Sequence, residues 1–391
     1  MKAPLCGFPC CLYHICDFHV INQIGIGGFS TVMLAQHHET NAKAAIKVIP
    51  KAKMSEESLT LEIKAICDLK HPLVSDLYFV HEDSENYYIG LEYMDGGTLR
   101  DTVNHAITIG EPKSRFYFCQ IAIFLDFLHN QKKIIHRDLK PDNIMVESGY
   151  LLKLIDFGLC KYLENTDNSQ GCGSPYYASP EMIKGEDYSF STDIWTAGIV
   201  LYIMMFGYLP FEEKEVQSLY DRIIFHEPSY ENRNKTAISN DVIDLIRKML
   251  IKDPQKRITI NDIVNHPWVI DGYKMLKEII DNAHNEDKGF DADDEKNDGI
   301  SKKNNPRFLI KKMIAKSLQN EKLSKLFKNT YFGAFDEKKD IMNTPKRIKS
   351  IAMQYANNNH HHGIDLFSQR KRRNQCHANC CPSRQRYNSF L

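Results

Sequence analysis

Residues 136–143 read His-Arg-Asp-Leu-Lys-Pro-Asp-Asn, and residues 156–158 read Asp-Phe-Gly directly after an apolar run, Leu151–Ile155. The first segment carries four side chains that can handle phosphate or a metal ion within eight residues. A charged loop beside an ordinary strand end is the structural alternative. Both patterns at this separation are improbable by chance, so the two segments decide the fold and predict a site for phosphate chemistry.

A glycine turn lies upstream, Ile24-Gly25-Ile26-Gly27-Gly28-Phe29-Ser30-Thr31-Val32, between two predicted strands. Glycines let the backbone approach phosphate oxygens closely and direct N–H groups at them. Alone, such a hairpin is more often only a turn, and Ser30 stands where a third glycine would be expected. Lys47 follows at the end of an apolar strand, a position where a lysine is usually solvated.

The periodicity of apolar residues predicts strands first and helices afterwards. The predicted strands are Phe18–Ile24, Val32–Gln36, Ala44–Ile49, Ser75–His81 and Asn86–Glu92, and the predicted helix among them is Ser55–Leu69. From Lys113 onward, helical periods dominate. The order indicates a small lobe with a sheet joined to a larger helical lobe.

In this order and spacing the motifs resemble a eukaryotic protein kinase domain over about Phe18 to Trp268. The resemblance implies an α+β, bilobal protein kinase fold with a small five-stranded lobe, one regulatory helix, a larger mainly α-helical lobe and ATP between them. The implied division of the chain is an N-terminal extension (1–17), a kinase domain (18–269, with lobes 18–93 and 94–269) and an acidic linker with a basic, mostly disordered regulatory tail (270–391).

The resemblance assigns catalytic roles position by position. Lys47 would hold the α and β phosphates, and Glu62 on the regulatory helix would keep Lys47 in place. Asp138 would accept or orient the proton of the attacking hydroxyl. Lys140 would neutralise the γ phosphate during transfer, and a lysine at this place resembles serine/threonine kinases.

The same resemblance implies ATP and Mg²⁺ sites, with Mn²⁺ as a substitute. Asp156 and Asn143 would bind the metal ions. The residues expected to surround ATP are Ile24, Gly25, Ile26, Gly27, Gly28, Phe29, Ser30, Thr31, Val32, Ala45, Lys47, Glu92, Met94 and Met145. The implied function is a serine/threonine protein kinase that transfers the γ-phosphoryl group of Mg-ATP to a protein hydroxyl. The alternative is a pseudokinase or scaffold that binds nucleotide or partner proteins without transfer.

Several other residues look structural within the same scheme. Glu181 would form a buried ion pair with Arg257, and Asp193 would tie its helix to the catalytic loop. An apolar column through both lobes is expected to contain Ile66, Leu77, His136 and Phe157.

Gly173–Glu181 and His266-Pro267-Trp268 resemble the calcium/calmodulin-dependent group, nearest its AMP-activated, SNF1-like branch. Two positions depart from that pattern. Gln170 replaces an activating threonine, and Thr98 replaces a glutamate that reads a substrate arginine in many members. Asp142 still offers one acidic contact to a substrate.

Composition indicates an ordinary globular protein, with 42% apolar and 26% charged residues in a chain of 391. The 50 basic and 50 acidic residues cancel, so no nucleic-acid partner is expected. The longest apolar run, Ile194–Phe206, predicts a buried helix, and no integral membrane segment is evident. Eleven scattered cysteines favour reduced thiols in a cytoplasmic protein.

The neutral total hides two segments of opposite charge. Residues 270–300 hold ten acidic and four basic residues, and residues 301–391 hold twenty basic and five acidic residues. Residues 307–328 form a basic amphipathic stretch that suits a calmodulin-like protein or autoinhibition in the substrate cleft, although a solvated or docked helix is the structural alternative. Arg370–Arg373 suits a nuclear import receptor or anionic lipid.

Overall fold

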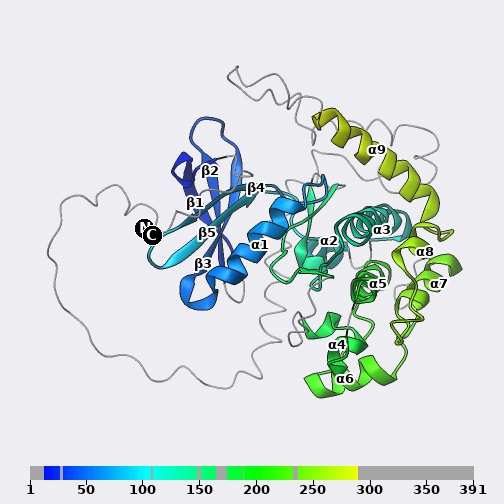
Figure 1. Cartoon of the computed structure of the whole chain (residues 1–391). Coiled ribbons are helices and arrows are strands. Elements are labelled where there is room, and N and C mark those ends of the chain that lie inside the picture. The colour runs from blue at the N-terminus through cyan, green and yellow to red at the C-terminus, as the bar shows by residue number, and fades with distance from the viewer. Residues whose placement is uncertain are drawn as a thin grey trace, which may run out of the picture. The chain divides into compact units, whose positions relative to one another are not determined.

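A computed structural model describes residues 13–26, 30–106, 109–147, 151–163, 174–187, 189–231 and 237–288. All of them belong to one compact unit, Met1–Lys328. They form a small lobe built on a sheet, blue to cyan in Figure 1, and a larger helical lobe, green to yellow. The expected α+β, two-lobed architecture is therefore confirmed.

The small lobe contains one antiparallel sheet with the strand order β1-β2-β3-β5-β4. Its strands are β1 (Phe18–Ile26), β2 (Thr31–His37), β3 (Lys43–Pro50), β4 (Leu77–Glu82) and β5 (Asn86–Glu92). One face of the sheet buries a cluster made of Phe18, Ala35, Ala44, Ile46 and Phe79. Because successive side chains of a strand alternate between faces, Ala45 and Lys47 of β3 point from the opposite face.

Helix α1 (Glu56–Asp68) crosses the small lobe beside the sheet (Figure 1). It begins at Ser55, whose Oγ accepts a hydrogen bond from the Ser58 N–H at 3.1 Å, as an N-cap does. Leu59, Ile63 and Ile66 are buried on one face of the helix, which matches the predicted spacing. The capping and this apolar face fix the rotation of α1 about its axis.

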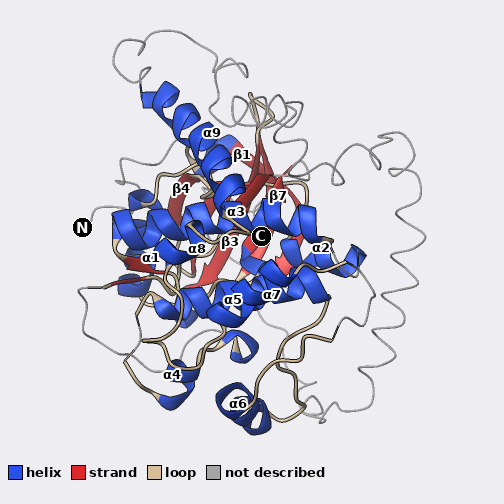
Figure 2. Cartoon of the chain, turned by 90° about the vertical axis from the view of Figure 1, so that its right-hand side faces the viewer, coloured by secondary structure: helices blue, strands red, loops and turns tan. Residues whose placement is uncertain are grey.

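The large lobe is mainly helical. Its helices are α2 (Leu99–Ala106), α3 (Glu111–Asp126), α4 (Pro180–Lys184), α5 (Ser191–Phe206), α6 (Val216–Phe225), α7 (Asn240–Met249), α8 (Ile260–Val264) and α9 (Ile270–Lys288). Helix α5 is buried along its length and packs against α3 and α7 near the middle of the lobe (Figure 2). No helix among the described residues is long and apolar enough to cross a membrane.

Short strands support the loops that carry the two deciding motifs. Strand β6 (Ile134–Ile135) pairs with β9 (Lys161–Tyr162), and β7 (Ile144–Glu147) pairs with β8 (Leu151–Leu154). Residues 136–143 lie between β6 and β7, and residues 156–158 lie between β8 and β9. Each motif therefore lies between a strand of one pair and a strand of the other pair.

Helix α9 lies in the segment that the sequence assigned to an acidic linker. Its residues Tyr273, Leu276 and Ile280 are buried, and the helix packs against α3. The Tyr273 hydroxyl also donates to a carboxylate oxygen of Asp126 at 2.8 Å. Structure thus continues beyond the expected domain end, because an apolar face recurs within a locally acidic composition.

Other expectations fall outside the described residues. These are the N-terminal residues 1–12, Gly27, Gly28, Phe29, Gln170 and the tail after residue 288, including 307–328.

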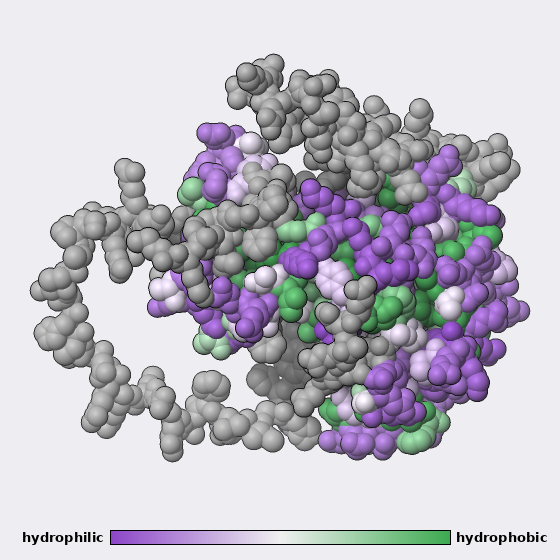
Figure 3. All heavy atoms as spheres, viewed as in Figure 1, coloured by the Kyte–Doolittle hydropathy of each residue, from purple (hydrophilic) through white to green (hydrophobic). Residues whose placement is uncertain are grey.

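Cys16, Cys119 and Cys160 are free thiols, as expected, whereas Cys67 is disulfide-bonded. Hydrophilic residues cover most of the described surface in the view of Figure 3, as the buried core requires.

Candidate functional site

Lys47, Glu62 and Asp156 come together from three separate elements. The Lys47 Nζ atom of β3 lies 2.8 Å from Glu62 Oε1 on α1 and 3.6 Å from Asp156 Oδ1 after β8. Glu62 is buried, with 3% of its side chain exposed, so its charge needs this partner. The ammonium group of Lys47 therefore connects the small lobe to the large lobe.

The charges in this group stabilise one another. Burial by itself would lower the pKa of Lys47, but the Glu62 and Asp156 carboxylates outweigh burial and raise it. Burial likewise would raise the pKa of Asp156, but Lys47, the Gly158 N–H, His136 and Lys140 together lower it. Lys47 is therefore held as a cation and Asp156 as an anion.

Asp138, Lys140 and Asn143 form a second group within the loop at 136–143. Lys140 Nζ lies 2.5 Å from Asp138 Oδ2, and Asn143 Nδ2 donates to the same oxygen at 2.9 Å. Asn143 Nδ2 also donates to the Asp138 carbonyl oxygen at 2.9 Å. Within the described residues, Asp138 Oδ1 has no hydrogen-bond donor, which leaves this atom available to a substrate hydroxyl.

The backbone of this loop is held from α5. Asp193 Oδ2 accepts hydrogen bonds from the His136 N–H at 2.8 Å and from His129 Nε2 at 2.9 Å, and Oδ1 accepts from the Arg137 N–H at 2.9 Å. Arg137 adopts a left-handed conformation with φ of 67°, which a non-glycine residue keeps only when its surroundings hold it. The predicted tie between Asp193 and the loop at 136–143 is confirmed.

The two groups are connected through the backbone and through a buried aromatic contact. The Ile155 N–H donates to the Asn143 carbonyl oxygen at 3.2 Å, so Asp156 follows directly after a residue bonded to the second group. The Phe157 ring is buried, and its centroid lies 5.4 Å from that of His136. Ile66 and Leu77 are also buried, so all four members of the expected apolar column are in the interior.

The face of the sheet toward Lys47 carries Gly25, Val32 and Ala45, three of the residues expected around ATP. Gly25 pairs with Val32, and Val32 pairs with Lys47. Ala45 lies two residues from Lys47 and so shares its face, while Met94 is buried in the connector between the lobes. The described positions among the expected ATP contacts are Ile24, Gly25, Ile26, Ser30, Thr31, Val32, Ala45, Lys47, Glu92, Met94 and Met145.

The donors near Asp156 fit a magnesium ion. Asp156 could supply a carboxylate oxygen, and Asn143 could supply its amide oxygen because its nitrogen is already bonded to Asp138. Magnesium prefers such hard oxygen ligands and usually takes one or two from the protein and the others from phosphate and water. No group of three or more His, Cys, Asp or Glu side chains that could hold a metal ion is found in the described part of the chain.

Some residues of the site were not predicted from the sequence. Lys153 Nζ of β8 lies 3.1 Å from Glu92 Oε2 at the end of β5, and both side chains are buried. His129 binds Asp193 and stacks on Phe190 with a centroid separation of 4.5 Å. The signal for Lys153 was a charged residue inside an apolar strand, which indicates a buried partner. His129 had no comparable signal because its partner is distant in sequence.

The expected acidic contact of Asp142 with a substrate stays a prediction. The structure adds a partner that the sequence did not indicate, because Arg100 of α2 binds both carboxylate oxygens of Asp142. The partner lies 42 residues away in sequence, which is why no local pattern indicated it.

The predicted ion pair between Glu181 and Arg257 is confirmed. Two nitrogen–oxygen contacts of 2.7 and 2.9 Å join the side chains, which are completely buried. Arg257 also donates to backbone carbonyl oxygens, those of Ile251, Ser191 and Lys252. The pair therefore joins α4 to the segment before α8.

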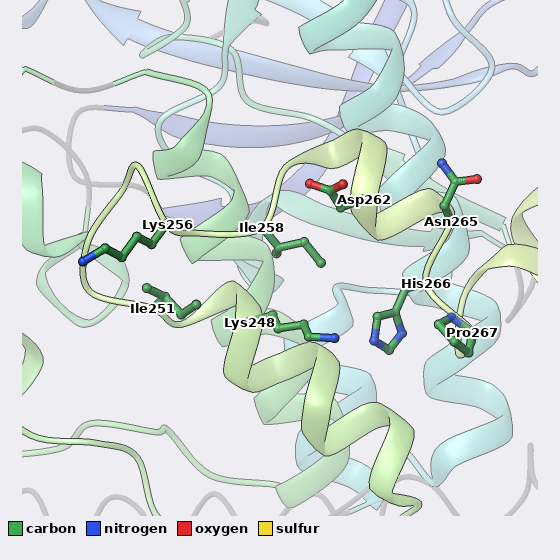
Figure 4. Close-up of a pocket in the computed structure, with 8 residues that line it drawn as sticks. All are labelled: Lys248, Ile251, Lys256, Ile258, Asp262, Asn265, His266 and Pro267. Atoms are coloured by element: carbon green, nitrogen blue, oxygen red, sulfur yellow. The ribbon is translucent and has the colours of Figure 1, made fainter.

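A separate pocket of about 460 Å³ opens in the large lobe (Figure 4). It is lined by Lys248, Ile251, Lys256, Ile258, Asp262, Asn265, His266 and Pro267. Lys248 and His266 both contact Asp244 Oδ2, at 2.6 and 3.0 Å. No residue of the groups Lys47–Glu62–Asp156 and Asp138–Lys140–Asn143 lines this pocket, which belongs to a different part of the lobe.

Comparison with known proteins assigns this sequence to a family. A model described as "Protein kinase domain" matches residues 18–269. The chain is 37% identical over 262 residues to the maternal embryonic leucine zipper kinase of Danio rerio, covering 66% of this chain and 38% of that protein. It is 36% identical over 262 residues to the probable serine/threonine-protein kinase MARK-A of Dictyostelium discoideum, covering 65% and 24%.

A third relative is the SNF1-related protein kinase catalytic subunit alpha KIN12 of Arabidopsis thaliana, 34% identical over 257 residues, covering 64% of this chain and 51% of that protein. The chain thus spans about half or less of the length of these relatives. Their names agree with the expected SNF1-like branch. Since the family model covers well over half of the chain, the chain belongs to the protein kinase domain family.

Proposed function

We propose that the protein is an ATP-dependent serine/threonine protein kinase. One observation carries the proposal: the structure contains two polar groups that are connected to each other. They are Lys47–Glu62–Asp156 and Asp138–Lys140–Asn143, and the hydrogen bond from the Ile155 N–H to the Asn143 carbonyl oxygen connects them. Phosphoryl transfer depends mainly on positioning and charge neutralisation, and these groups supply both. The family membership and the names of the relatives point the same way.

In this proposal the first group binds the nucleotide. Lys47 contacts the α and β phosphates, and Glu62 fixes its orientation through the contact of 2.8 Å. Oxygen atoms of Asp156 and Asn143 would hold Mg²⁺, which would neutralise charge on the phosphates. The adenine ring would lie against the apolar side chains of the sheet face and bond the backbone between Glu92 and Met94.

The second group acts on the acceptor. Asp138 Oδ2 is held by Lys140 and Asn143, so Oδ1 is free to accept the hydrogen bond of a serine or threonine hydroxyl and then its proton. A general base of this kind contributes roughly 10²- to 10⁴-fold to the rate. Lys140 stands beside the attacking oxygen and offsets the negative charge of the γ phosphate as it moves.

The proposal predicts that two single substitutions abolish transfer. Asp138→Asn removes the base, and Lys47→Met removes the cation that positions the phosphates. We expect each variant to lose at least about 100-fold in kcat on a mixed protein substrate with Mg-ATP. Lys248→Met is the matched control, because Lys248 is also ion-paired but belongs to α7.

The alternative function, a pseudokinase or scaffold, gives a different result. Transfer would then be absent from the wild type while ATP binding, followed by titration, persists. Equal transfer by the wild type, Asp138→Asn and Lys47→Met would contradict the proposed roles altogether.

A further inference from the structure

The surface around Asp138 decides which peptides can present a hydroxyl there. A serine or threonine that reaches Asp138 Oδ1 brings its neighbouring residues over the side chains beside this loop. Asp142 lies four residues after Asp138, on the turn Pro141–Asn143, and 41% of its side chain is exposed. Its carboxylate is therefore accessible from solvent on the same loop as Asp138.

Arg100 holds Asp142 in a two-pronged contact. Arg100 Nε lies 2.5 Å from Asp142 Oδ1, and Nη2 lies 2.7 Å from Oδ2. Nη2 also donates to the Tyr177 hydroxyl at 3.1 Å. Two parallel N–H···O bonds fix the plane of the guanidinium group, so the three side chains form one rigid arrangement.

The supporting elements hold this arrangement beside the catalytic loop. Thr98 and Asp101 bond each other at the start of α2, with Thr98 Oγ1 at 2.7 Å from Asp101 Oδ2. This contact fixes the first turn of α2, from which Arg100 projects. Tyr177 is buried, and burial raises its pKa to about 12, although Arg100 acts to lower the pKa. The Tyr177 hydroxyl therefore stays protonated and accepts the hydrogen bond from Arg100.

The contact changes the charge that a substrate meets. Both oxygens of Asp142 accept bonds from Arg100, so they are engaged before any substrate arginine arrives. Arg100 keeps 44% of its side chain exposed, and within the described residues no acceptor contacts its Nη1 atom. The ion pair is neutral as a whole, so an incoming guanidinium finds no net negative charge there and approaches the Arg100 cation, whereas an incoming carboxylate or phosphate meets unused N–H donors.

We propose that Arg100 is a specificity-determining residue: clamped on Asp142, it makes the substrate surface prefer an anionic side chain near the acceptor and reject an arginine. The inference rests on the proposed kinase function and names its substrate class. The anionic group is a glutamate or aspartate carboxylate or a phosphorylated residue, since both chemistries suit the same N–H donors.

The test compares peptides that share one serine acceptor. Each of the four positions before and the four after the serine carries glutamine, glutamate, phosphoserine or arginine in turn, and kcat/KM is measured for the full-length protein. The wild type should use an anionic peptide about tenfold better, and an arginine peptide about tenfold worse, than the glutamine peptide at one or more positions. Separate glutamate and phosphoserine peptides distinguish the two sources of negative charge.

Variants assign the preference to Arg100. Arg100→Gln should bring the anionic-to-arginine ratio of kcat/KM down by at least about tenfold, because Asp142 is then released to bind arginine. Arg100→Lys keeps the charge without the two-pronged contact and should retain part of the ratio. Lys248→Gln removes a lysine of similar exposure, 46%, from another ion pair and should leave the ratio unchanged.

The outcomes separate this inference from the proposed function. An unchanged ratio in Arg100→Gln, with transfer and thermal unfolding like those of the wild type, overturns the role of Arg100 and leaves the kinase intact. A wild type that favours arginine peptides overturns it equally. Absence of transfer to every peptide and to a mixed protein substrate overturns the kinase function, and the inference with it.

Discussion

At the scale of single residues, Glu181 and Arg257 show how a buried charge depends on its partner. Both side chains are completely buried, and each would be an uncompensated charge without the other. Burial by itself would raise the pKa of Glu181, but its hydrogen bonds with Arg257 more than offset this and lower the pKa. Substitutions in this pair therefore test the stability of the fold and not the proposed catalysis.

We predict that Arg257→Met lowers the free energy of unfolding by about 3–5 kcal/mol, because Glu181 is left buried without its partner. Denaturant unfolding followed by circular dichroism measures the change. Arg222→Met is the control, since Arg222 and Glu213 form an exposed pair, which is worth about 1 kcal/mol or less. Similar losses in both variants would contradict the importance of burial.

The same pair predicts a dependence on pH. Since the pKa of Glu181 is lower in the folded state than its ordinary value of 4.5, its contribution is fully present above that value and is lost as the pH falls through the folded pKa. The stability difference between wild type and Glu181→Gln should therefore shrink as the pH falls below about 4.5. A difference that is constant from pH 7 to pH 3 would count against this assignment.

The sequence predicted those residues of the site that lie within short motifs. Asp138, Lys140 and Asn143 fall within six positions, so a local pattern reports their chemistry. Glu62 followed from the family's spacing, and the structure brings it to Lys47. Arg100 and His129 were missed because their partners are far along the chain and become neighbours only through packing.

At the scale of elements, the connector between the lobes depends on a close backbone contact. A Cβ atom at Gly96 would lie 2.0 Å from the Val146 carbonyl oxygen of β7, and the three nearest atoms are all backbone atoms of Val146 and Glu147, which have little room to move. The Val146 N–H in turn donates to the Gly97 carbonyl oxygen at 2.9 Å. The connector is thus fixed against β7 at the edge of the proposed adenine site.

We predict that Gly96→Ala destabilises the protein by about 1–3 kcal/mol and weakens ATP binding, since the connector must shift away from β7. Gly110→Ala is a useful comparison. Gly110 has a φ of 82°, so alanine there strains the backbone, but no atom lies within 4 Å of the added Cβ. We expect Gly110→Ala to lose stability without a change in ATP affinity. Unchanged ATP affinity in Gly96→Ala, measured by titration calorimetry, would refute the proposed position of the base.

The elements of the small lobe were predictable and α9 was not, for a physical reason. The strands and α1 follow apolar periods bounded by turn residues, and their observed limits differ from the predicted ones by a few residues. In α9 three buried side chains are separated by charged residues. The average composition therefore suggested a solvated segment, and only the position of α3 explains the helix.

At the scale of the whole molecule, the basic segment 307–328 is the main untested expectation. If it occupies the substrate cleft, deletion of residues 301–391 should raise basal activity by roughly tenfold, because a tethered segment competes at millimolar effective concentration. Deletion of residues 329–391 alone keeps the segment and should leave the activity low. Both deletions retain α9, so thermal unfolding checks that the folded part is intact. Equal basal rates in all three proteins would remove the autoinhibitory role.

The attachment of the catalytic loop to Asp193 has a consequence for partial melting. That loop takes its shape from α5, deep in the large lobe, while Lys47 takes its position from the sheet of the small lobe. Opening of the small lobe alone would release the nucleotide and silence turnover, yet the acceptor side would stay assembled. If heating opens only the small lobe, we expect the sheet to re-form on cooling and the proposed activity to return without unfolding of the large lobe.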